Sequence, residues 1–210
     1  MKLSIIYNVA CKMSYLHLKG VIHRDLKPSN ILIDSNFYPK ICDFGCSKSF
    51  GRIEKDKNDT FFGTPLYLAP EIWKENEYST KSDVYAFGLI MYEILIGPLP
   101  FANFDSSQIC YQVAVKNKKP PISDQIPNFY KEIINSCLSS DPNQRPSFDE
   151  IVNKLRNSED FITYSIGDKY KKPLISISSL CSYKPWILHE GEGLFFGDNN
   201  NRLFRKKTEI

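Results

Sequence analysis

The chain has 210 residues, and 42% of them are hydrophobic, which is enough to bury the core of one domain with a tail. Its 27 basic and 24 acidic residues leave a net charge of +3, so the sequence predicts no nucleic-acid and no membrane partner. Six scattered cysteines without a metal-binding pattern predict reduced thiols and a cytoplasmic location.

The first predicted element is a helix that begins near the amino terminus. Gly20 stands where this helix should end. Asn8 and Lys12 interrupt its apolar residues, which argues against a signal peptide. The apolar residues have a helical period, at positions 3, 6, 10, 13 and 16. Short segments rich in β-branched residues then predict three strands, at 21–22, 31–33 and 39–42.

Two strings lie among these predicted strands. Residues 23–30 read His-Arg-Asp-Leu-Lys-Pro-Ser-Asn, and Asp-Phe-Gly begins thirteen residues after Asn30. Together they resemble the catalytic loop and the magnesium-binding triplet of a protein kinase. Eight matching positions followed by the triplet at the expected distance make a chance match very improbable.

The resemblance assigns a role to each polar residue of the two strings. Asp25 would accept the proton of a substrate hydroxyl, and Lys27 would place its ammonium against the transferring phosphate. Asn30 and Asp43 would hold Mg²⁺, a hard cation that takes oxygen ligands. Leu32 would lie under the adenine ring of ATP, although plain core packing is an alternative reading of that residue.

A third string, Gly-Thr-Pro-Leu-Tyr-Leu-Ala-Pro-Glu, resembles the end of a kinase activation segment. The resemblance implies that its Thr64 bonds Asp25 and Lys27 and helps to select a hydroxyl substrate. It also implies that Glu71 is buried and paired with Arg145, because a buried carboxylate requires such a partner.

Thr60 precedes Thr64 by four residues, where kinases with arginine before the catalytic aspartate carry an activating phosphate. By resemblance, a phosphate on Thr60 would contact Arg24 and Lys48 and order the segment. The alternative is that Thr60 is an ordinary polar loop residue.

The second half of the chain predicts helices. The first of them is apolar on more than one face and should be buried nearly all round. The kinase resemblance implies that Asp83 at its start accepts backbone N–H bonds from the residues around His23. Ser147 is a predicted N-cap, with Glu150 three residues on. The four predicted helices lie at 79–96, 105–117, 127–138 and 147–157.

The resemblance covers residues 1–157 and implies an α+β fold class, namely the mainly α-helical large lobe of the protein-kinase-like fold. The strings at 83–88 and 141–148 are most similar to the tyrosine-kinase-like (TKL) group, which is mostly serine/threonine-specific. The small β-rich lobe is expected to be missing, since only 22 residues precede the catalytic loop. Residues 158–210 form a C-terminal tail to which the sequence assigns no role.

The resemblance implies a serine/threonine kinase that uses ATP and Mg²⁺ on a protein substrate. We expect negligible turnover from this chain alone, and a small-lobe or regulatory partner at its exposed apolar surface. The alternatives are a non-catalytic kinase-like binding module and a truncated relic. The intact Asp25 and Asp43 favour the kinase, since substitution there would have supported a binding module.

Overall fold

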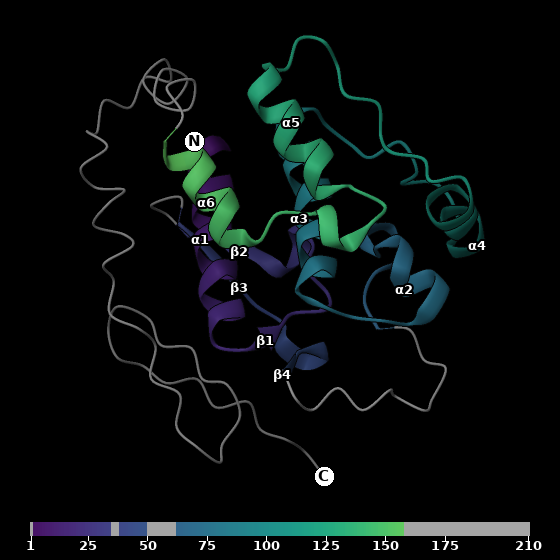
Figure 1. Ribbon diagram of the computed structural model, residues 1–210, viewed down its shortest axis with the longest axis horizontal. Helices are drawn as coiled ribbons and strands as arrows, with labels where there is room; N and C mark the ends of the chain where they lie inside the picture. Colours follow the sequence, from purple (N-terminus) through teal and green to yellow (C-terminus); the bar gives the residue numbers. More distant parts are fainter. Residues whose placement is uncertain (1, 35–37, 50–61, 158–210) are drawn as a thin grey trace. The chain divides into compact units, whose positions relative to one another are not determined.

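The computed structural model describes residues 2–34, 38–49 and 62–157, and it is mainly helical with two small sheets (Figure 1). The helices are α1 (Lys2–Leu18), α2 (Pro70–Glu75), α3 (Thr80–Leu95), α4 (Ser106–Cys110), α5 (Asn128–Cys137) and α6 (Phe148–Arg156). The strands are β1 (Val21–Ile22), β2 (Ile31–Ile33), β3 (Pro39–Ile41) and β4 (Lys48–Ser49). The predicted tail at 158–210 lies outside the described residues.

The core lies where α1, α3, α5 and α6 pack together. α1 runs beside α6, and α3 packs against both α1 and α5 (Figure 1). Phe148 of α6 joins α1 and α3, because its ring lies 5.1 Å from the His17 ring of α1 and 5.1 Å from the Phe87 ring of α3. Edge-on aromatic pairs at this separation add to the stabilisation that comes from burial.

α3 is the central helix, and it is buried nearly all round as predicted. Every residue from 82 to 92 is buried. Its N-terminus is closed by a reciprocal pair, in which the Ser79 hydroxyl accepts from a backbone N–H and the Ser82 hydroxyl accepts from the backbone of Ser79. Such a helix is a rigid support for groups attached to its first turn.

Two antiparallel strand pairs flank the loop that carries the first string. β1 pairs with β4, so that Ile22 lies opposite Lys48, and β2 pairs with β3, so that Ile31 lies opposite Ile41. The second pair holds the backbone after Asn30 against the backbone before Asp43. β4 was not predicted, because a Lys-Ser dipeptide carries no strand signal.

Two further differences from the sequence predictions concern helices. α2 was not predicted, although Pro70 stands at its first position and Asn76 ends it in a left-handed conformation. The predicted helix at 105–117 is α4 followed by a π-helix, Tyr111–Val115. The other predicted helices are confirmed, including the Ser147 cap of α6. No helix in the described ranges is both long and apolar enough to cross a membrane.

Candidate active site

Asp83, in the first turn of α3, anchors the loop that carries His23 and Asp25. Its two carboxylate oxygens accept the backbone N–H of His23 at 2.8 Å and that of Arg24 at 3.0 Å, as predicted. The His17 ring nitrogen Nε2 lies 2.9 Å from the same carboxylate, a partner that the sequence did not predict. These bonds hold Arg24 at φ 71°, a conformation that costs a non-glycine residue about 1–2 kcal/mol.

The buried His23 ring connects this loop to the strand that precedes Asp43. Its Nδ1 accepts the backbone N–H of Asp25 at 3.3 Å, so the ring proton belongs on Nε2, which lies 3.1 Å from the Cys42 carbonyl oxygen. The ring also lies 5.0 Å from that of Phe44. His23 therefore fixes the relative position of the two strings.

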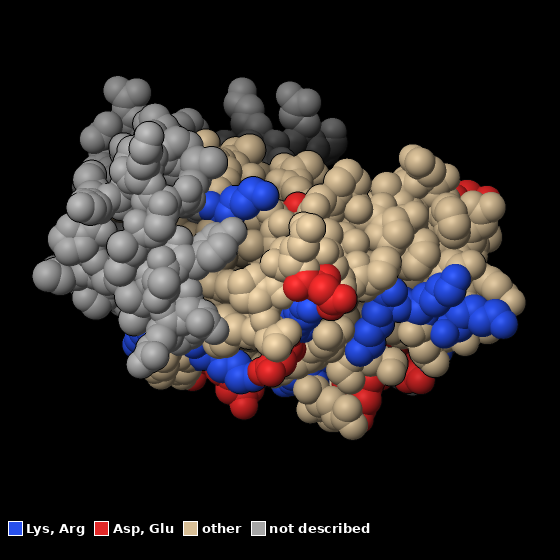
Figure 2. Space-filling model, turned by 90° about the horizontal axis from the view of Figure 1, so that it is seen from above, with Lys and Arg blue, Asp and Glu red and all other residues tan. Residues whose placement is uncertain are grey.

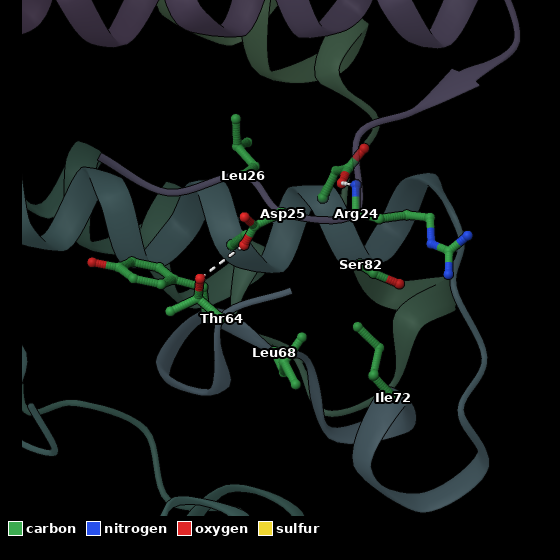
Figure 3. Close-up of a pocket in the computed structure, with 10 residues that line it drawn as sticks. Arg24, Asp25, Leu26, Thr64, Leu68, Ile72 and Ser82 are labelled. Atoms are coloured by element: carbon green, nitrogen blue, oxygen red, sulfur yellow. Dashed lines mark hydrogen bonds between the residues drawn. The ribbon is translucent and has the colours of Figure 1, made fainter. Parts of the chain in front are cut away.

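Asp25, Lys27, Asn30 and Thr64 form one hydrogen-bonded cluster, in which the resemblance implied the contacts of Thr64 with Asp25 and Lys27 but not those of Asn30 with Asp25. The Thr64 hydroxyl donates to Asp25 Oδ1 at 2.8 Å, and Lys27 Nζ lies 2.9 Å from Asp25 Oδ2 and 2.6 Å from Thr64 Oγ1. The Asn30 amide donates to the Asp25 backbone oxygen at 2.8 Å and to Oδ2 at 3.1 Å. Figure 3 shows Thr64 and Asp25 turned toward each other across the bond.

Asn30 and Asp43 are the two residues that could hold a metal ion, and they lie on neighbouring segments. The Cys42 N–H donates to the Asn30 carbonyl at 2.9 Å, so the two segments lie side by side. The Asn30 side-chain nitrogen is engaged by Asp25, which leaves its side-chain oxygen to serve a cation. Asp43 is exposed and has a left-handed backbone at φ 62°. A carboxylate and an amide oxygen are both ligands that a hard divalent cation accepts.

Leu32 is 57% exposed, so it is not a core residue in the described structure. It lies in β2 opposite Lys40, which is also exposed. The core-packing alternative for Leu32 is therefore wrong. The adenine contact stays a prediction.

A small cavity lies behind Asp25, between the catalytic loop and the segment that follows Thr64 (Figure 3). Arg24 and Leu26 line it from the loop, and Leu68 and Ile72 line it from the segment. Its volume of about 10 Å³ suits one water molecule, so it is too small to be the site of a nucleotide.

The expected pair between Glu71 and Arg145 is present, but Glu71 is only partly buried, with 12% of its side chain exposed, so Arg145 is the buried partner. Arg145 is 1% exposed, and its two terminal nitrogens donate to the two Glu71 oxygens at 2.7 Å each. Its remaining N–H groups donate to the backbone oxygens of Lys81 at 2.9 Å and Ser139 at 2.8 Å. The pair thus ties α2 to the start of α3 and to the turn that precedes α6.

Two aromatic rings enclose the guanidinium of Arg24, which the sequence did not predict. The rings of Phe62 and Tyr78 each lie 4.4 Å from its central carbon, and the Tyr78 hydroxyl donates to the Phe62 carbonyl at 2.7 Å. Thr60, the predicted phosphorylation site, lies outside the described residues, and Lys48 is in β4.

A second unpredicted contact joins the segment after Thr64 to α3. The Tyr67 hydroxyl donates to Glu93 at 2.6 Å. Burial, followed by this bond and the carboxylate's charge, raises the pKa of Tyr67 above its ordinary value. No local signal could have found the contact, because the two residues are 26 positions apart.

Residues 2–155 match the protein kinase domain family. The chain is 42% identical over 147 residues to a probable serine/threonine-protein kinase of Dictyostelium discoideum, which covers 70% of this chain and 16% of that protein. It is 34% identical over 191 residues to the serine/threonine/tyrosine-protein kinase HT1 of Arabidopsis thaliana, covering 91% and 47%. It is 41% identical over 152 residues to the dual specificity protein kinase shkA of D. discoideum, covering 71% and 28%. The chain spans less than half the length of each of these relatives.

Proposed function

This chain belongs to the protein kinase family, and on that premise we propose that its Asp25 site transfers the γ-phosphate of ATP to a serine or threonine hydroxyl in a protein. The observation that carries the proposal is the cluster of Asp25, Lys27 and Thr64. We further assign residues 1–157 to the large lobe of a kinase of the tyrosine-kinase-like group. The mainly helical architecture and the strings at 83–88 and 141–148 support this assignment.

Asp25 is placed to take the substrate hydroxyl. An ionised carboxylate offers about four acceptor positions. Thr64, Lys27 and Asn30 each donate to one of its two oxygens, so one position is left for a further donor. A substrate hydroxyl that donates there is oriented with its oxygen toward the phosphate, and Asp25 takes the proton as the new bond forms.

Lys27 and the predicted metal ligands would offset the negative charge of the phosphates. The Lys27 ammonium, fixed between Asp25 and Thr64, places a positive charge beside the position of the hydroxyl. Asn30 and Asp43 would hold Mg²⁺, which when bound with ATP neutralises the charge of the phosphates. Exposed Leu32 offers an apolar surface to the adenine.

We propose Thr60 as the regulatory phosphorylation site, with Arg24 and Lys48 as its contacts. The aromatic stack on Arg24 supports this, because Phe62, one of the two rings, follows Thr60 by two residues. A phosphate on Thr60 that binds Arg24 would then fix the segment to the loop that carries Asp25. Thr60→Ala is expected to reduce activity, and a phosphopeptide map of active protein without a mark on Thr60 would contradict the proposal.

The exposed side chains of Leu32 and Ile33 are the surface on which we propose that a small lobe or a regulatory partner binds. The cytoplasm is the proposed location. None of the five described cysteines forms a disulfide, which agrees with a reducing compartment.

The test is phosphate transfer by the protein at its native length, and the unchanged protein and its variants are each expressed in cells and immunopurified. With radiolabelled ATP, Mg²⁺ and a protein substrate, we expect phosphoserine or phosphothreonine, and Asp25→Asn should lower the rate by about 10²–10⁴-fold. Asp124→Asn, at an exposed aspartate that pairs with Lys131, is the matched control and should keep full activity. Equal rates for Asp25→Asn and the unchanged protein would refute the proposal. Phosphotyrosine as the main product would refute the proposal that serine or threonine is the acceptor.

A further inference from the structure

An exposed apolar strip lies on the π-helix Tyr111–Val115. Tyr111 is 48% exposed and Val115 is 62% exposed, while Val113 and Ala114 on the same helix are buried. The π-helix packs against α2, and the adjoining α4 packs against the turn Pro65–Tyr67. The strip therefore faces outward from a support that is itself held by the segment after Thr64.

Three lysines follow this strip in the chain, and the ammonium of the last, Lys119, donates to the Asn135 carbonyl of α5 at 3.4 Å. Lys116, Lys118 and Lys119 are exposed, and none of them forms an ion pair with another described residue. The Lys116 ammonium lies 5.4 Å from the centre of the Tyr111 ring. Between Ser106 and Pro121 the sequence contains these three basic residues and no acidic one. Figure 2 shows blue atoms gathered on the side of the molecule where α4 lies in Figure 1.

The backbone that carries the lysines is fixed at several points. The Lys116 N–H donates to the Tyr111 carbonyl and the Lys118 N–H to the Gln112 carbonyl, each at 2.9 Å. Asn117 between them has φ 48°, a left-handed conformation that asparagine tolerates better than most residues. Further along, the Tyr92 hydroxyl donates to the Pro121 carbonyl at 3.1 Å. The lysines are thus presented from an ordered backbone, which lowers the entropy that binding must overcome.

We propose that Tyr111, Val115, Lys116, Lys118 and Lys119, here called the Tyr111 patch, bind an acidic segment of a partner protein that carries one or two large apolar side chains. The apolar side chains would cover Tyr111 and Val115, and the carboxylates would meet the lysines. Complementary charge decides the sign of the partner, since the three charged side chains between Ser106 and Pro121 are all positive. The patch contains no residue of the Asp25 site, so this binding and phosphate transfer can fail independently.

The chemistry of the patch favours a protein over a nucleic acid. A nucleic-acid site needs a long track of positive charge for the backbone phosphates, and arginine and aromatic faces on which bases can stack. Here the charge comes from three lysines within four residues, which is a short track, and no arginine lies among them. The aliphatic Val115, the more exposed of the two apolar residues, offers bases no stacking surface.

Fluorescence anisotropy with the 210-residue chain tests the proposal. The probe is a fluorescein-labelled peptide, Glu-Asp-Leu-Phe-Asp-Glu, and two control peptides replace its acids by lysine or its Leu-Phe pair by Ser-Ser. We expect saturable binding of the first peptide only, weakened by added salt because the charges are exposed. The double variant Lys116→Glu/Lys118→Glu should weaken binding by about tenfold or more, and Tyr111→Ser should weaken it several-fold.

Lys19→Glu is the matched control for the charge change. Lys19 is exposed, and its ammonium lies 5.6 Å from the ring centre of Tyr15, a second lysine–tyrosine pair away from the patch. This variant should bind the acidic peptide as the unchanged chain does. Unaltered thermal unfolding of every variant should accompany these results, since the changed side chains are exposed.

Three results would overturn the proposal. The first is an absence of saturable binding by the acidic peptide, or equal binding by the Ser-Ser peptide. The second is an equal loss of binding in Lys19→Glu and in the double variant. The third is tighter binding of a single-stranded twelve-nucleotide uridine RNA that the double variant abolishes, which would assign the patch to nucleic acid.

Discussion

The ion pair between Glu71 and Arg145 gives the sharpest prediction on stability. The Arg145 side chain is 0% exposed and that of Glu71 is 12% exposed, so the charge of Arg145 depends on Glu71 for neutralisation. Glu71→Gln keeps the shape of the side chain and removes its charge. The guanidinium then keeps its bonds to two backbone oxygens but loses its one ion-pair partner among the described residues.

The expected loss follows from that arrangement. Removing one partner of a buried pair costs about 3–5 kcal/mol, because the other charge is left uncompensated. A domain of this size is stable by about 5–15 kcal/mol, so Glu71→Gln removes a large part of the total. Arg145→Met should cost about as much, since it strands the Glu71 carboxylate and two carbonyls. The double variant should lose clearly less than the sum, with a coupling of about 2 kcal/mol.

Urea denaturation of the chain, followed by circular dichroism, measures these free energies of unfolding. Glu150→Gln is the control, because Glu150 is an exposed carboxylate that caps α6, and its loss should be below about 1 kcal/mol. A loss below about 1 kcal/mol for Glu71→Gln, or strict additivity in the double variant, would show that the pair does not depend on mutual neutralisation.

Three further predictions concern close packing and alkaline pH. Gly63→Ala should destabilise the fold by more than the roughly 1–2 kcal/mol of backbone strain, because at φ 102° its new Cβ would lie 2.7 Å from the Arg24 carbonyl oxygen. Gly97→Ala, at φ 134° with open space around it, should show the strain alone. Equal losses of unfolding free energy for the two variants in urea would refute the clash at Gly63. Gly88→Ala should cost about 1–3 kcal/mol, since its Cβ would meet that of Cys137 at 2.8 Å across α3 and α5, and an unchanged melting temperature would contradict this. Burial raises the pKa of the Cys137 thiol to about 12 from 9.0, so the native thiol keeps a proton that the unfolded chain loses. The free energy of unfolding should therefore fall between those two pH values, by up to about 1.4 kcal/mol per pH unit. Cys137→Ala should flatten this part of the pH profile, and an identical profile for the variant would argue against the prediction.

Local sequence signals predicted much of the fold and of the candidate site. The helical period, the Ser147 cap and the apolar run of α3 gave helices close to those in the structure, because they act within one element. Asp25, Lys27 and Thr64 were found because the strings that contain them resemble kinase motifs. Local signals did not predict very short elements such as β4, and they did not predict that a π-helix replaces the α-helix from Tyr111.

The sequence by itself determined which chemical groups the site contains and in which order the chain presents them. Only the tertiary structure decided how the groups are held. His17 of α1 lies 2.9 Å from the Asp83 carboxylate, the Arg24 guanidinium lies 4.4 Å from the rings of both Phe62 and Tyr78, and Tyr67 donates to a carboxylate on α3. Such contacts join residues that are distant in the chain, so they depend on how helices pack and which side chains become buried, and no local pattern records that.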